Sequence, residues 1–155
     1  MTQSNAIKPS ESFEAPQEAL CHILGNTLSL AETTLNFRWN VIGHFHMPLH
    51  GLFKDQADEL WRAADRIGER IRALDAMAVA DRSDDLILPC VKMKAGEPVC
   101  EQMICILKQA HGGMALAIKA AIDVARADDD DASILLLSER LLAHAGHLRT
   151  LAAFE

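Results

Sequence analysis

Apolar residues recur every three or four positions in four long blocks of this chain, and this α-helical periodicity constrains its fold more than any other feature. No segment shows the alternation of apolar and polar residues that is typical of a strand. Pro48, near the start of the second block, is tolerated because the amides of a first helical turn have no helical partner. The sequence therefore predicts an all-α fold with helices over about 17–43, 46–74, 99–127 and 131–153.

The connections between the blocks indicate how the helices are arranged. Residues 75–98 hold an acidic run, two prolines and a glycine, so they form a long connection. A connection of that length in a compact domain usually crosses the body of a bundle. The other two are short: Gly43 ends the first helix, and the acidic run 128–131 supplies a turn and a capping carboxylate for the fourth. A long crossover between the second and third helices is the pattern of a ferritin-like four-helix bundle.

The length of 155 residues suits one domain with a single core, which we place at residues 16–155. Residues 1–15 are polar and lack apolar periodicity, so a flexible polar tail is expected there. That segment has no apolar run of signal-peptide length, and no stretch of the chain is long enough to cross a bilayer. The four cysteines form no CxxC pair, which favours reduced thiols and a cytoplasmic location.

The charge of the chain bears on nucleic-acid binding. The formal net charge is −7, and the basic residues do not cluster strongly. The tail carries Lys8 against Glu11 and Glu14. Because affinity for DNA comes largely from contacts of Lys and Arg with phosphates, strong DNA binding is not expected.

Residues 35–50, LNFRWNVIGHFHMPLH, resemble the Dps family of mini-ferritins, the proteins of DNA protection during starvation. The segment DELWRAADRIGERIRAL resembles a second motif of that family, and the resemblance is clearest over about residues 20–75. It implies a homo-oligomeric hollow cage, a dodecamer built from two-fold dimers, with ferroxidase activity, iron storage and a role in stress protection. The matching positions are Asn36, Phe37, Trp39, Asn40, Gly43, Leu49, His50, Asp65, Glu69, Arg70 and Ile71.

Asp65 and Glu69 are candidate metal ligands because their i, i+4 spacing projects both carboxylates from one helix face. His50 lies near that face but fifteen residues earlier, roughly 22 Å away along a helix. One chain therefore cannot bring all three side chains to one ion, whereas two antiparallel copies around a two-fold axis can. The resemblance implies that His50, Asp65 and Glu69 bind non-haem iron at such an interface between subunits.

Two further ligand positions implied by the resemblance carry basic residues here. A histidine is expected at position 38 and an acidic residue at 54, but the chain has Arg38 and Lys54. Arg38 continues the apolar face of the first helix and is expected to point inward. Neither cationic side chain suits a divalent ion. One hypothesis is that both pair with Asp65 and Glu69 of a neighbour and replace the iron, and the alternative is a weakened one-ion site.

A second candidate metal site is the run H-x-H-x-x-x-H formed by His44, His46 and His50. His46 and His50 have the i, i+4 spacing that can chelate zinc or copper, and His44 could join from the turn before the helix. A chance cluster of histidines is the plainer interpretation of the same pattern.

Polar residues of the fourth helix have simpler structural interpretations. His144 and His147, at i, i+3 near its end, are interpreted as structural partners of the helix dipole. Asp130 is first of all a helix-capping residue. The resemblance implies that acidic residues near this turn line three-fold pores that admit iron. Because Leu135 stands where another acid is expected, a pore role is limited here to Asp130.

Overall fold

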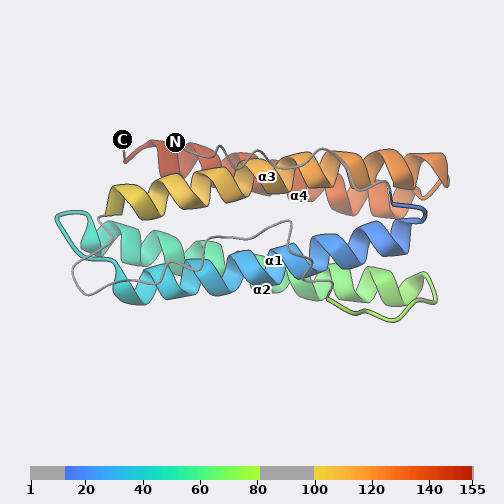
Figure 1. Ribbon diagram of the computed structural model, residues 1–155, viewed down its shortest axis with the longest axis horizontal. Coiled ribbons are helices and arrows are strands. Elements are labelled where there is room, and N and C mark those ends of the chain that lie inside the picture. The colour runs from blue at the N-terminus through green and yellow to red at the C-terminus, as the bar shows by residue number, and fades with distance from the viewer. Residues whose placement is uncertain (1–12, 81–99, 155) are drawn as a thin grey trace, which may run out of the picture.

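Four helices make up the computed structural model, which describes residues 13–80 and 100–154. Helices α1 and α2 form one antiparallel pair and α3 and α4 form the other, and α1 also packs against α3 (Figure 1). The described residues contain no strand. Residues 81–98 of the predicted crossover lie outside the described residues, as do residue 99 and residues 1–12 of the predicted tail. The helices are α1 (Pro16–Asn40), α2 (His46–Ala73), α3 (Cys100–Ala127) and α4 (Asp131–Ala152), which confirms the predicted all-α bundle.

The core lies between the two pairs and is built from large apolar side chains spaced three or four residues apart. The rings of Phe37 on α1 and Phe53 on α2 pack with their centroids 6.4 Å apart. Full burial of such a side chain contributes about 1.5–3 kcal/mol to folding. The largest fully buried residues are Phe37, Phe53, Leu20, Ile23, Leu30, Leu49, Leu60, Ile67, Ile71, Met103, Leu107 and Met114.

The sequence predicts one buried face for α1, formed by Leu20, Leu24, Leu28, Ala31 and Leu35, but the buried face is rotated from it. Leu28 and Leu35 are half-buried at the edge of the core, whereas Leu30, Thr34 and Phe37 are buried in it. Thr34 tolerates this position because its hydroxyl donates to the carbonyl of Leu30 at 2.7 Å. The apolar spacing alone could not reveal this rotation, because small hydroxyl residues share the buried face.

The turn between α1 and α2 explains where α1 ends. The helix stops at Asn40, three residues before the predicted end, and Gly43 adopts a left-handed φ of 104° inside the turn. A Cβ at Gly43 would lie 3.4 Å from the Cys100 sulfur, so a side chain would meet both strain and a close neighbour. Glycine is therefore required by this turn.

The acidic run between α3 and α4 provides the predicted helix cap. Asp130 Oδ1 accepts from the Ser133 amide at 3.0 Å and from Arg70 Nη2 of α2 at 2.6 Å. Burial alone would raise the pKa of Asp130, but the Ser133 hydrogen bonds and the Arg70 guanidinium outweigh burial and lower it. The cap thus also joins the start of α4 to the C-terminal part of α2.

None of the described helices is both long enough and apolar enough to traverse a bilayer. Among the described residues, Cys21, Cys100 and Cys105 are free thiols.

Replacing Asp130 tests this junction. We expect Asp130→Ala to lower the free energy of unfolding by about 1–3 kcal/mol, because it removes both the cap and the ion pair. Asp130→Asn keeps a capping oxygen and should lose less. Urea unfolding at one fixed protein concentration measures both variants. Equal stability of Asp130→Ala and the unaltered chain would contradict the assigned role.

Candidate metal sites and a buried histidine cluster

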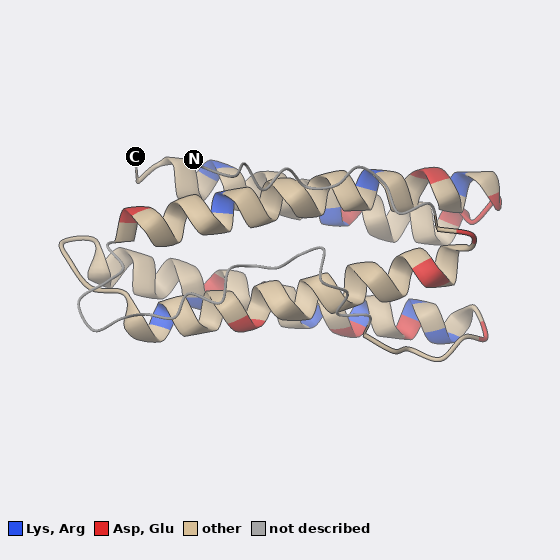
Figure 2. Cartoon of the chain, viewed as in Figure 1, with Lys and Arg blue, Asp and Glu red and all other residues tan. Residues whose placement is uncertain are grey.

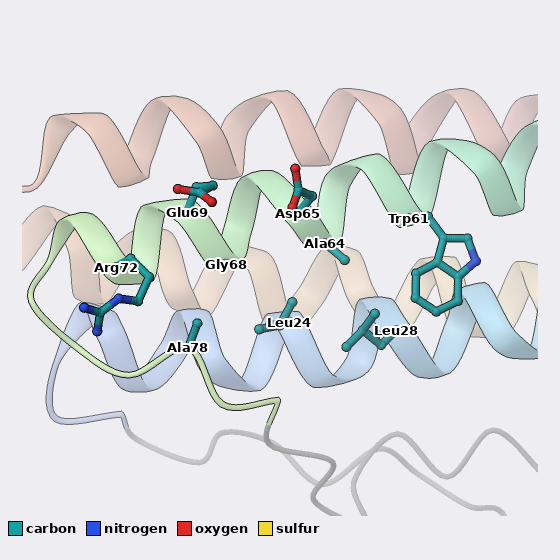
Figure 3. Close-up of a pocket in the computed structure, with 9 residues that line it drawn as sticks. All are labelled: Leu24, Leu28, Trp61, Ala64, Asp65, Gly68, Glu69, Arg72 and Ala78. Carbon is teal, nitrogen blue, oxygen red and sulfur yellow. The ribbon is translucent and has the colours of Figure 1, made fainter.

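A groove of about 460 Å³ runs along α1 and α2, and its rim carries the predicted acidic ligands (Figure 3). Leu24 and Leu28 of α1 and Trp61 of α2 form its apolar part. Asp65 and Glu69 project from one side of α2, one turn apart, as their spacing predicted. Both are exposed, and neither has a hydrogen-bond or ion-pair partner in the described part of the chain. The groove thus presents two unpaired carboxylates beside an apolar surface.

His50, the third predicted ligand, lies near the other end of α2 and is half-buried. It does not line the groove that Asp65 and Glu69 share. Across residues 13–80 and 100–154, no three or more His, Cys, Asp or Glu side chains are placed to hold a metal ion. A site made from His50, Asp65 and Glu69 therefore requires a second copy of the chain.

Lys54 has a partner that the sequence analysis did not consider. Its ammonium group lies 2.6 Å from Asp58, one turn further along α2, with both side chains about half exposed. The Lys54 hydrogen bond, with weaker effects of Arg62 and Arg38, lowers the pKa of Asp58. Arg38 is half-buried as expected, but its Nε is buried without a hydrogen-bond partner among the described residues. Arg38 is thus the less satisfied of the two cations.

The histidines around the start of α2 differ in their surroundings. His46 Nδ1 donates to the Val41 carbonyl at 2.6 Å. The rings of His46 and His50 lie 5.8 Å apart between centroids. The exposed His44 instead packs edge-on against Phe45 at 5.5 Å. The structure therefore brings His46 and His50 together but does not show His44 joining them.

Five polar residues that the sequence analysis did not connect form a cluster between α2, α3 and α4. Arg140 donates to both carboxylate oxygens of Glu59, at 3.1 Å to Oε2. His147 Nε2 donates to the same Oε2 at 3.0 Å. Nδ1 of His111 and Nδ1 of His144 are 2.8 Å apart, so one donates and the other accepts. His111 and His144 are fully buried. We call these residues the core cluster.

The core cluster corrects the dipole interpretation of His144. Burial, together with the nearby Arg140, lowers the pKa of His144 to about 3, and burial lowers the pKa of His111 well below its ordinary value. His144 is therefore neutral at pH 7 and cannot act as a cationic partner of the helix end. For Glu59, hydrogen bonds from His147 and Arg140 outweigh burial and lower the pKa to about 2.

A spacing signal for the core cluster was present in the sequence. Arg140, His144 and His147 follow Leu137 at three- and four-residue steps, on the same face of α4 as the buried Leu151. Polar residues on a buried face indicate an interior network, but their partners on α2 and α3 depend on the tertiary fold. The cluster also retains unmatched atoms, because Nε2 of His111, Nε2 of His144 and Nε of Arg140 have no hydrogen-bond partner among the described residues.

Other predicted positions lie at the surface or in structural roles. Trp39 and Trp61 are 64% and 42% exposed, so neither belongs to the core of one subunit. Asp130 caps α4 as described above, and its pore role stays a prediction because it needs neighbouring subunits.

Figure 2 shows Lys and Arg distributed over all four helices and interspersed with acidic residues, with no purely basic helix in the described part of the chain.

Comparison with known proteins places this architecture in a family. The family of the ferritin-like domain matches residues 17–154. DNA protection during starvation protein 2 of Bacillus anthracis is 30% identical over 117 residues, which cover 74% of this chain and 80% of that protein. An uncharacterized low temperature-induced protein of Nostoc sp. is 27% identical over 101 residues, 64% of this chain but only 56% of that protein.

Solved structures agree in fold. Dps from Thermosynechococcus elongatus superposes with a TM-score of 0.78 at 24% identity, covering 90% of this chain and 88% of that one. Dps from Listeria monocytogenes gives a TM-score of 0.81 at 17% identity, covering 94% and 96%. The chain therefore belongs to the ferritin-like family and, within it, to the Dps proteins. This confirms the resemblance and the ferritin-like bundle expected from the sequence.

From the buried histidines of the core cluster we predict that the free energy of unfolding falls in acid. Because folding holds His111 and His144 neutral, the unfolded chain takes up protons below its ordinary histidine pKa of 6.5 that the folded chain does not. The contribution of the two histidines to the free energy of unfolding should be fully present above that pH. It should fall as the pH drops towards 3, by up to about 1.4 kcal/mol per pH unit for each histidine. Glu59 adds to the loss as the pH falls from 4.5 towards 2.

Urea unfolding between pH 7 and pH 4 measures this dependence. The double variant His111→Leu/His144→Leu should show a flatter profile between pH 6.5 and 4, because neither position can then take up a proton. The exposed His44→Leu serves as the matched control and should keep the original slope. Identical slopes for the unaltered chain and the double variant would refute the role of the cluster.

Proposed function

We propose that this Dps protein assembles with copies of itself into a hollow iron-storage cage of the dodecameric type, with an altered iron site between subunits. The observation that carries this proposal is the pair of unpaired carboxylates, Asp65 and Glu69, beside the groove of α1 and α2. Side chains of this kind suit ferrous iron, which in this proposal is substrate and cargo of the protein. The family match supports the same assignment.

The site is proposed to form where two α2 helices lie antiparallel around a two-fold axis. Because about 22 Å of helix separates His50 from Asp65, each end of α2 needs the opposite end of a neighbour's α2. Trp61 and the half-buried Leu28 are apolar surface in the groove that such a neighbour would cover. Each dimer would then contain two equivalent sites.

Arg38 and Lys54 are proposed to occupy the place of iron in these sites. The Nε of Arg38 lacks a hydrogen-bond partner in the described chain, so a neighbour's carboxylate would satisfy it. The Lys54–Asp58 pair is about half exposed, and exposed pairs of this kind contribute only about 0–1 kcal/mol, so Lys54 can exchange partners at little cost. The resulting ion pairs would hold the interface together without metal and with little or no ferroxidase activity.

A second candidate function is a ferroxidase with one ion per site. It is favoured by the same absence of partners at Asp65 and Glu69, and by the intrachain pairing of Lys54 with Asp58. If Lys54 stays with Asp58, His50 of one subunit and the carboxylates of another could still bind one ferrous ion. Compaction of DNA is not proposed, because the basic residues of the described helices are interspersed with acidic ones and the net charge of the chain is −7.

Anaerobic titration of the assembled protein with Fe(II), followed by peroxide, distinguishes the two candidates. We expect the unaltered protein to show no saturable binding of Fe(II) at the interface sites and to oxidise Fe(II) only slowly. Arg38→His/Lys54→Asp restores a neutral ligand and an acid, so it should gain saturable binding and faster oxidation. Saturable binding and rapid oxidation by the unaltered protein would instead establish the one-ion ferroxidase.

A matched variant tests the ion pairs directly. Asp65→Asn/Glu69→Gln keeps the side-chain shapes but removes both negative charges, so the assembly should dissociate at a higher protein concentration than the unaltered protein and lose part of its salt sensitivity. Analytical ultracentrifugation at two ionic strengths measures both effects. Unchanged assembly in this variant would exclude these carboxylates from the interface ion pairs.

A further inference from the structure

The start of α2 carries two imidazoles whose geometry suits a metal other than iron. His46 and His50 lie one turn apart, with ring centroids 5.8 Å apart. Side chains at i and i+4 on a helix face the same direction and can bind one ion together. Imidazole nitrogen is a preferred ligand of zinc and copper.

The Val41 carbonyl fixes one of these ligands. His46 Nδ1 donates to it at 2.6 Å, which places the proton on Nδ1 and leaves Nε2 as a lone-pair donor. Metal-binding histidines commonly donate their second nitrogen to a backbone carbonyl in this way, because the contact fixes the tautomer and the ring orientation. This contact connects the turn after α1 to the first residue of α2, so the ring is held by the fold itself.

His50 is free to complete the pair. It has no hydrogen bond or ion pair within residues 13–80 and 100–154, so a ring nitrogen remains available for an ion. His46 is exposed and His50 half-buried, which leaves the site open to an ion from solvent. His44 packs on Phe45 instead of on the rings of His46 and His50.

We propose that His46 and His50 form a two-histidine site for a divalent transition ion of the zinc and copper class, with water completing the coordination. Both ligands lie within one subunit, so the site can form without a second copy of the chain, although it shares His50 with the proposed iron site. It uses His50 but neither Asp65 nor Glu69. The positive end of the helix dipole opposes the ion, and two nitrogen–metal bonds have to outweigh that effect.

Isothermal titration of the full-length protein with ZnCl2 at pH 7.5 tests the site, with MgCl2 as a hard-ion control. We expect one zinc per chain and no magnesium binding. His46→Ala and His50→Ala should each weaken zinc binding at least about tenfold, equivalent to about 1.4 kcal/mol. His44→Ala is the matched control from the same turn and should bind zinc as the unaltered protein does. Absorption of bound Co(II) gives a second measurement of the same site.

The acidic double variant separates this site from the proposed iron site. Asp65→Asn/Glu69→Gln should retain zinc binding, whatever it does to iron or to assembly. Zinc binding that is unchanged by His46→Ala would overturn the proposal. So would binding that is lost in the acidic double variant, because the ion would then occupy the interface between subunits.

Discussion

The helical rise of α2 sets the conditions for every candidate site in this protein. The helix is 28 residues long, and at about 1.5 Å per residue it separates the His46/His50 end from the Asp65/Glu69 end by more than any side chain can reach. Its inner face is occupied by Phe53, Leu60 and Ile67, so ligands can only lie along its edges. Because the helix cannot fold back on itself, His50 and the Asp65/Glu69 pair cannot meet within one chain. In the proposed assembly, the antiparallel α2 of a symmetric partner would bring them together.

Features encoded locally were predictable from the sequence, and features made by tertiary contacts were not. The Asp130 cap depends on residues three positions apart, and the periodicity of four long blocks gave their ends within a few residues. The placement of Asp65 and Glu69 on one side of α2 also followed from spacing alone. By contrast, the rotation of α1 about its axis depends on which helices it packs against. Leu28 and Leu35 therefore lie at the core edge, although the apolar pattern placed them within it.

The core cluster shows the same limit more clearly. Glu59, His111 and His144 belong to three different helices, and no spacing rule connects them. Partial burial of an ionised Glu59 is tolerated because Arg140 and His147 donate to its carboxylate. Full burial of the imidazoles of His111 and His144 is tolerated because they remain neutral. An apolar set of similar volume would cost less, but the hydrogen bonds among these polar groups require α2, α3 and α4 to keep their present arrangement. The network therefore opposes sliding of the helices, at a cost in acid stability.

Charge balance decides which of the two candidate iron chemistries the interface can support. Arg38 and Lys54 together contribute +2, and Asp65 and Glu69 contribute −2, so four groups brought together need no ion for neutrality. Ferrous iron would then leave an uncompensated charge of +2 in a partly buried interface, which is strongly unfavourable. If Asp58 retains Lys54, the remaining sum is −1, and one ion at His50, Asp65 and Glu69 regains an electrostatic advantage. In the proposed assembly, the half-exposed Lys54–Asp58 contact would therefore decide whether the interface favours ion pairs or iron, although neither residue would need to touch iron. The proposed binding of zinc at His46 and His50 does not depend on this charge balance, because its ligands are neutral imidazoles.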